Sequence, residues 1–269
     1  MTRTRSVSRS RLLLAAALVV LVAAPVTVPW QLVAQEAPPA EPKQAAEAPA
    51  NIQAEMRHQA VDQLMRLGLA LHNYHSDKKS FPPPAILGAN GKPLLSWRVA
   101  ILPYLGEPEA VDQGAALYKQ FDLTQPWDSP HNYPLVAKMP DVFKCPGSTA
   151  PAGMTVYLAP RGDSTVFPGP KGLPVRQITD GTSNTIGIVE VNDRLAVPWT
   201  KPDDWTFDPA APAQGLGGHF KDVFLTLFCD GSAHALSTGI NQDGLRALVT
   251  RNGREIVVID DHGDAKVNP

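Results

Sequence analysis

LGLALHNYHSDKKSFPPP, the stretch from Leu67 to Pro84, decides how this chain is organised. It begins with apolar residues at helical spacing, becomes polar in its centre and closes with three consecutive prolines. Because proline cannot continue a helix and disfavours helical geometry in the residue before it, the helix is predicted to end by Ser76. The stretch therefore divides a leading helix from the rest of the chain.

Upstream of this division, apolar residues recur at spacings of three and four, which places them on one face of a helix. These residues are Met56, Ala60, Leu64, Leu67, Leu71 and Tyr74. Charged residues occupy the other side, where Asp62 precedes Arg66 by four positions in the favourable order for an ion pair. Asn51 is a suitable N-cap. The pattern predicts one amphipathic helix from Asn51 to Ser76.

Downstream, short apolar runs alternate with turns and with long loops rich in proline and glycine. Strands are predicted at 142–145, 154–159, 177–178, 184–191, 223–229, 232–237 and 255–259, and short helices at 96–105, 115–123 and 241–249. The clearest hairpin joins VFLTLFC (223–229) to 232–237 through Asp230 and Gly231. Residues 51–265 are long enough for a single domain with a sizeable core, and we expect the α+β class.

The N-terminal region has the composition of an export signal. Residues 1–11 contain four arginines and no acidic residue, and the apolar run Leu12–Val22 follows. This pattern predicts a Sec-type signal peptide or a retained N-terminal anchor over residues 1–34, and hence a periplasmic or cell-surface location. Residues 35–50, QEAPPAEPKQAAEAPA, lack large apolar side chains and are expected to form a disordered linker. Membrane contact is expected only through an uncleaved N-terminal segment.

The charge balance excludes one class of partner. The 269 residues carry 24 Lys and Arg against 26 Asp and Glu, a formal net charge of −2. A nucleic-acid-binding protein needs a basic stripe, which this composition does not supply.

Cys145 and Cys229 are the only cysteines. In an oxidising compartment they can form a disulfide that closes a long loop. Alternatively, each is a separate buried thiol, since free cysteine behaves as a small apolar residue. The sequence leaves both possibilities open.

Several motifs resemble one known family. LHNYHSDKKSFPPP, SWRVAILPYL, LYKQFDLTQPWDSPHN, FKCPGS, DGTSNTI, PWTKPDDW, DGSAHALS and LRALVTRNGREIV follow one another in this order between about residue 54 and residue 260. The series resembles the planctomycete family of domain-of-unknown-function number 1559, also labelled a type-10 bacterial solute-binding-protein family. The family motif positions here are His72, Asn73, Tyr74, His75, Asp128, His131, Asn132, Asp180, Gly181, His219, Asp230 and Gly231.

The resemblance implies a pilin-like fold, in which a long N-terminal helix packs on an antiparallel β-sheet. Typical members begin with a prepilin-type N-terminus and end with a histidine, nine residues and Asp-Gly. In this chain, the arginine-rich signal and the linker replace the apolar half of the pilin helix. Ten residues, rather than nine, separate His219 from Asp230.

Each residue that could take part in metal binding or catalysis also has a purely structural interpretation. His72 and His75 stand three apart on the helix, so they are weak metal candidates or a helix-end packing pair. The Asp-Gly dipeptides at 180–181 and 230–231 are first of all turns, although their carboxylates are calcium ligands by type. An acid/base cluster of His219, Asp230 and His234, with Ser183 as nucleophile, would define a metal-dependent or hydrolytic protein. No catalytic motif connects these residues, so we expect no enzyme and no cofactor.

Four tryptophans stand in polar loops: Trp97, Trp127, Trp199 and Trp205. They either stack on a ligand such as a glycan or pin the long loops to the body. The sequence therefore predicts an exported, non-enzymatic structural or interaction protein of the bacterial cell envelope, with an envelope protein or a surface glycan as partner. The alternative is an extracytoplasmic module that binds a glycan or small solute through these loop tryptophans.

Overall fold

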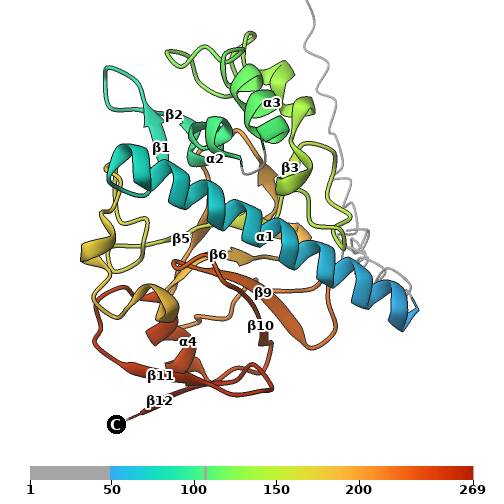
Figure 1. Cartoon of the computed structure of the whole chain (residues 1–269), viewed down its shortest axis with the longest axis vertical. Coiled ribbons are helices and arrows are strands. Elements are labelled where there is room, and N and C mark those ends of the chain that lie inside the picture. The colour runs from blue at the N-terminus through green and yellow to red at the C-terminus, as the bar shows by residue number, and fades with distance from the viewer. Residues whose placement is uncertain (1–48, 106–107, 269) are drawn as a thin grey trace, which may run out of the picture. The chain divides into compact units, whose positions relative to one another are not determined.

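A single long helix, α1 (Ala50–Lys78), leads the described part of the chain in this computed structural model (Figure 1). The structure describes residues 49–105 and 108–268, so the predicted signal segment and residues 35–48 of the predicted linker lie outside it. α1 ends two residues later than predicted, where Lys79 adopts left-handed geometry and its N–H donates to the carbonyl of His75 at 2.7 Å. Asn51 is not the N-cap, because Pro49 takes that position and the helix begins one residue earlier.

The principal sheet is antiparallel and has the strand order β10-β9-β6-β4. Its strands are β4 (Tyr157–Leu158), β6 (Ile186–Glu190), β9 (Val223–Phe228) and β10 (Ala233–Ser237). α1 contacts β9 and β10 from one side, and α4 (Gln242–Val249) contacts β6 (Figure 1). All five residues of β6 are buried, because both faces of this central strand are covered. The α+β class, with one N-terminal helix on an antiparallel sheet, is confirmed.

Short elements extend from this centre. The two-stranded pairs are β1 (Ala85–Leu87) with β2 (Pro93–Ser96), β3 (Met154–Thr155) with β7 (Val197–Pro198), β5 (Pro160–Arg161) with β8 (Trp205–Thr206), and β11 (Ile256–Ile259) with β12 (Ala265–Asn268). The remaining α-helices are α2 (Trp97–Ala100) and α3 (Pro108–Tyr118). The 3-10 helices are η1 (Leu102–Tyr104), η2 (Tyr133–Lys138), η3 (Asp141–Phe143), η4 (Val175–Gln177), η5 (Thr182–Asn184) and η6 (Asp193–Leu195).

The β9–β10 hairpin forms as predicted, with Gly231 at a φ of 92° in its turn. That turn meets α1 closely, because a Cβ added to Gly68 would lie 2.9 Å from the Cα of Gly231. Two predicted strands are wrong: residues 142–145 begin in η3, and residues 177–178 are the last residue of η4 and the residue after it instead of a strand paired with β6. In both runs the chain forms a 3-10 turn instead of a strand. Each run is too short to show the two-residue alternation that identifies a strand. The predicted helix at 115–123 is α3, which ends at Tyr118.

Within the described residues, α1 and the shorter helices lack the combination of length and apolarity that a membrane crossing requires.

Candidate functional site

Three of the four predicted ligand-stacking tryptophans belong to the core. Trp97 and Trp199 have no exposed surface, and Trp205 is 5% exposed. Each indole N–H finds an internal acceptor: a carboxylate oxygen of Asp204 for Trp97, and backbone carbonyls for Trp199 and Trp205. The stacking prediction is wrong for these three, because their buried rings and paired N–H groups fasten α2, β8 and the segment after β7 to the body. Trp127 is half-buried beside Tyr133.

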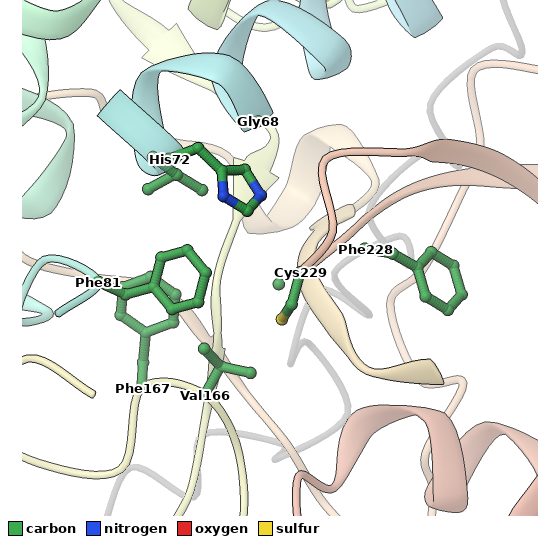
Figure 2. A pocket seen from close by; sticks show the side chains of 9 residues that line it. Gly68, His72, Phe81, Val166, Phe167, Phe228 and Cys229 are labelled. Carbon is green, nitrogen blue, oxygen red and sulfur yellow. The ribbon is translucent and has the colours of Figure 1, made fainter. Parts of the chain in front are cut away.

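The helix histidines pack around one phenylalanine. The ring of Phe81 lies 5.9 Å from the ring of His72 and 5.6 Å from that of His75. Figure 2 shows His72 directed toward a cavity of about 10 Å³, whose other walls include Phe81, Phe167 and Cys229. Such a volume admits one water molecule at most. Burial, followed by the neighbouring His72, lowers the pKa of His75, which agrees with a helix-end packing pair.

The two cysteines are separate thiols, and both are buried. Burial raises the pKa of Cys145 to about 12 and also raises the pKa of Cys229 above its ordinary value. The disulfide alternative is therefore not what the structure contains. Neither thiol is poised as a nucleophile, because the reactive thiolate is disfavoured.

The predicted cluster of His219, Asp230 and His234 does not assemble. The Asp230 carboxylate accepts hydrogen bonds from the backbone and side chain of Ser232 in the hairpin turn. The exposed ring of His234 contacts the Ser232 hydroxyl at 3.0 Å. Ser183 lies in η5, and in the described part of the chain no hydrogen bond joins its hydroxyl to a histidine. These residues shape local turns rather than a reaction centre.

His219 instead belongs to a buried polar centre that the sequence did not reveal. Its Nδ1 lies 2.6 Å from Oε1 of Glu190, and its Nε2 lies 2.8 Å from Oδ1 of Asp193. The side chains of His219 and Glu190 are 3% and 0% exposed. The other Glu190 oxygen accepts from the backbone N–H of Leu225 at 2.9 Å. An imidazole between two carboxylates is held as the cation.

Electrostatics agree with this assignment. Burial alone lowers the pKa of His219, but the hydrogen bonds and charges of Glu190 and Asp193 outweigh burial and raise it. For Asp193, partial burial raises the pKa, and the bonds from Ser148, Thr149 and His219 together bring it well below the usual range. The thiol of Cys145 completes the centre: its Sγ and one ligand atom each of Glu190 and His219 all lie within 4.8 Å of one another.

One signal in the sequence could have pointed to this centre. Glu190 ends the apolar strand β6, where a buried carboxylate is costly unless a cation or hydrogen-bond donors meet it. A partner was therefore required, although the sequence did not identify which histidine provides it.

The other family motif residues organise loops. The Asn132 amide nitrogen donates to the carbonyls of Asp122, Gln125 and Pro126 at 2.9–3.1 Å, and its oxygen accepts from the Asp122 N–H. His131 contacts the carbonyl of Gln120 at 2.9 Å, and Asp128 is exposed.

A second group of motif residues connects segments that are distant in the chain. The Asp180 carboxylate accepts from the N–H groups of Gly253 and Arg254, both at 2.8 Å. At the end of α1, Asn73 donates to the carbonyl of Tyr104, and the Tyr74 and Tyr104 rings pack edge to face at 5.3 Å. The motif thus maintains the fold and places aromatic residues at the end of α1.

These aromatic residues line a solvent-open groove of about 380 Å³. Tyr74, Tyr104 and Tyr118 contribute to its walls, together with Pro83, Ile86 and Pro103. Lys78 supplies a charged rim, where its Nζ lies 3.0 Å from Oδ2 of Asp77. The Tyr104 hydroxyl donates to that same Asp77 oxygen at 2.5 Å. Aromatic faces beside a few fixed polar groups are the usual composition of a small-ligand site.

Comparison with known proteins gives one family. Residues 57–170 match the family described as "Protein of unknown function (DUF1559)". No curated protein matches the chain, and no solved structure matches it.

Proposed function

This chain belongs, through residues 57–170, to the DUF1559 family of proteins of unknown function, and we propose that it is an exported, non-enzymatic, pilin-like interaction protein of the bacterial cell envelope. We further propose that the tyrosine groove at the end of α1 is its binding site and that a surface glycan is the ligand. We therefore propose this groove, and not the loop tryptophans, as the ligand-binding site.

The observation that carries the proposal is the contrast between the buried centre and the open groove. The groups most capable of chemistry, Cys145, Glu190 and His219, are buried, and the charges of His219 and Glu190 neutralise each other through a hydrogen bond. A hydrolase needs such groups within reach of its substrate. The groove, in contrast, meets solvent and presents aromatic faces beside the Asp77–Lys78 pair. Binding therefore suits this site better than catalysis.

The choice of a glycan follows from the lining. Aromatic rings present flat apolar faces, and the Asp77–Lys78 pair beside them supplies both hydrogen-bond acceptors and donors. A sugar ring presents the complementary combination, with C–H groups on its faces and hydroxyls around its edge. The volume of about 380 Å³ lies within the usual range for small-ligand sites, roughly 300–1,000 Å³.

Export is supported by the N-terminal sequence. The arginines of residues 1–11 and the apolar run that follows them are typical of a secretory signal. The helix packed on an antiparallel sheet supports a pilin-like descent. Cell fractionation of the full chain, beside a form without residues 1–34, tests export: the full chain should be extracytoplasmic and the shortened form should not.

Binding is tested by calorimetric titration with a panel of soluble oligosaccharides built from hexoses and N-acetylhexosamines. We expect at least one to bind, and Tyr118→Ala to weaken that binding by about tenfold or more, since losing one aromatic contact removes roughly 1–2 kcal/mol. Tyr133→Ala is the matched control, because Tyr133 is 59% exposed and does not line the groove. Silence across the panel, or equal weakening by both variants, would overturn the glycan proposal.

A further inference from the structure

We propose that Cys145, Glu190 and His219 form the ligand set of a buried zinc site, with Asp193 as the carboxylate that orients the histidine. The site is separate from the tyrosine groove and independent of the glycan proposal. It concerns how this fold is held together rather than what the fold binds at its surface.

The donor types select the metal. Cysteine sulfur, histidine nitrogen and glutamate oxygen are the protein ligands that zinc takes, and three of them within one cluster leave a fourth position for water or another oxygen. Magnesium and calcium prefer sites made wholly of oxygen, so a buried thiol argues against both. The three ligand atoms already lie within 4.8 Å of one another and come from three separate segments of the chain.

The orientation of His219 matches that of a zinc ligand. Its Nδ1 faces Glu190 inside the cluster, whereas its Nε2 faces Asp193 outside it. In zinc sites, a ligating histidine commonly donates its other ring N–H to a carboxylate, which fixes the tautomer. Asp193 is itself held by Ser148 and by the backbone and side chain of Thr149, at 2.6–2.9 Å. The outer carboxylate is therefore already in place.

The loop that contains Cys145 also packs closely against His219. A Cβ added to Gly147, two residues after the cysteine, would lie 2.9 Å from the Cβ of His219. The glycine allows the cysteine loop to approach the histidine backbone this closely. The juxtaposition of Cys145 and His219 thus depends on a backbone approach that a larger residue would prevent.

Charge is conserved when zinc replaces protons. Without metal, both ring nitrogens of His219 donate to the carboxylates of Glu190 and Asp193, so the imidazole carries two ring protons, and the thiol of Cys145 carries its own. Zinc binding releases the thiol proton of Cys145 and the Nδ1 proton of His219. Two positive charges leave as protons and two arrive as Zn²⁺, so the net charge of the buried centre does not change.

The required movement is small. Ligand atoms around a tetrahedral zinc ion lie roughly 3.3–3.8 Å apart, given metal–ligand distances of about 2.0–2.3 Å. The Glu190 oxygen has to withdraw somewhat from its 2.6 Å contact with Nδ1, and the widest separations within the 4.8 Å cluster have to shorten. We expect side-chain rotations of Cys145 and Glu190 to make both changes.

Zinc would then join the loop after η3, the end of strand β6 and the segment before β9. Since a metal that binds only the folded state stabilises that state, zinc is expected to raise the melting temperature of the protein. A role in stability explains why the site is buried.

The test uses the full chain, purified without a polyhistidine tag and stripped with a chelator. Calorimetry with ZnCl₂ in buffers of different ionisation enthalpy should show one equivalent bound and about two protons released. Substitution with Co²⁺ should produce a sulfur-to-cobalt charge-transfer absorption in the near ultraviolet. Cys145→Ser should abolish that absorption, whereas Cys229→Ser, which alters the other buried thiol, should retain it.

Asp193→Asn tests the outer carboxylate separately, because it leaves all three ligands intact. We expect it to weaken zinc binding by about 10- to 100-fold and to leave the charge-transfer absorption in place at saturation. The proposal is overturned if the folded wild-type protein binds no stoichiometric zinc, or if Cys145→Ser and Cys229→Ser bind zinc equally well. Circular dichroism of each variant confirms that it is folded before titration.

Discussion

Arg98 donates from Nη2 to Oδ1 of Asp204 at 2.6 Å, and neither side chain has any exposed surface. The guanidinium also donates to the carbonyl of Tyr157 at 3.1 Å and 3.3 Å. The same Asp204 oxygen accepts from the Trp97 indole and from the Ala159 backbone. One buried ion pair therefore connects α2, the loop before β8 and the strand β4 at the sheet edge.

Breaking this pair is expected to destabilise the protein strongly. Asp204→Leu leaves the Arg98 charge buried without a counter-ion, so we expect the free energy of unfolding to fall by about 3–5 kcal/mol. The double variant Arg98→Met with Asp204→Leu should recover much of this loss, because it removes both charges. Urea denaturation of the wild type, both single variants and the double variant measures the effect. Simple additivity of the two single losses would contradict the interpretation.

The contact between α1 and the β9–β10 turn should be sensitive to added volume at Gly68. Gly68→Val places a side chain against the backbone of Gly231, which cannot rotate away as a side chain can. We expect a loss of about 2–3 kcal/mol from overpacking. Gly169→Val is the control, since nothing lies within 4 Å of a Cβ built there, and it should change stability by no more than about 0.5 kcal/mol. Thermal unfolding of both variants measures the loss of stability. Similar losses in the two variants would refute a specific contact between Gly68 and the β9–β10 turn.

The ionisation of Asp77, at the rim of the tyrosine groove, should depend on its hydrogen bond from Tyr104. The hydrogen bond from Tyr104, and then Lys78, lowers the pKa of Asp77 below its ordinary 3.8. A carboxyl whose pKa is lowered by folding contributes stability above its unfolded pKa and loses that contribution as pH falls through its folded pKa. Tyr104→Phe removes the largest cause, so the pKa of Asp77 should rise toward 3.8.

A carboxyl NMR titration of Asp77 measures this shift directly in wild type and variant. Because Asp77 is exposed, the change in global stability should be slight. Tyr133→Phe, which alters a tyrosine outside the groove, should leave the titration of Asp77 unchanged. An Asp77 titration that is identical in wild type and in Tyr104→Phe would show that the hydroxyl does not stabilise the carboxylate.

Local patterns in the sequence were enough to predict the leading helix, the hairpin and the α+β class. The apolar face of α1, including Leu64 and Leu67, is buried as its spacing predicts. The turn at Asp230 and Gly231 follows from glycine's access to positive φ, and it joins two strands that are adjacent in the chain. Such features depend on residues only a few positions apart, so periodicity and turn chemistry are sufficient to find them.

The positions of the tryptophans could not be predicted in this way. Trp199 and Trp205 stand beside polar residues in the sequence, and Trp97 stands between Ser96 and Arg98. The burial of all three was decided by contacts with other segments of the chain. The tyrosine groove likewise depends on bringing α1, η1 and α3 together. Polarity along the chain says little about exposure when a distant segment covers the residue.

The sequence by itself determined a helix, a hairpin, a body of short apolar runs separated by turns and loops, and an N-terminal region typical of export. Each of these depends on residues that are close together in the chain. Only the tertiary structure decided which polar residues meet: Cys145, Glu190 and His219 are separated by 45 and 29 positions yet lie within 4.8 Å. Burial then decides their chemistry, since carboxylates removed from water require a cation. His219 supplies that cation as an imidazolium, and the same geometry fits a zinc ion.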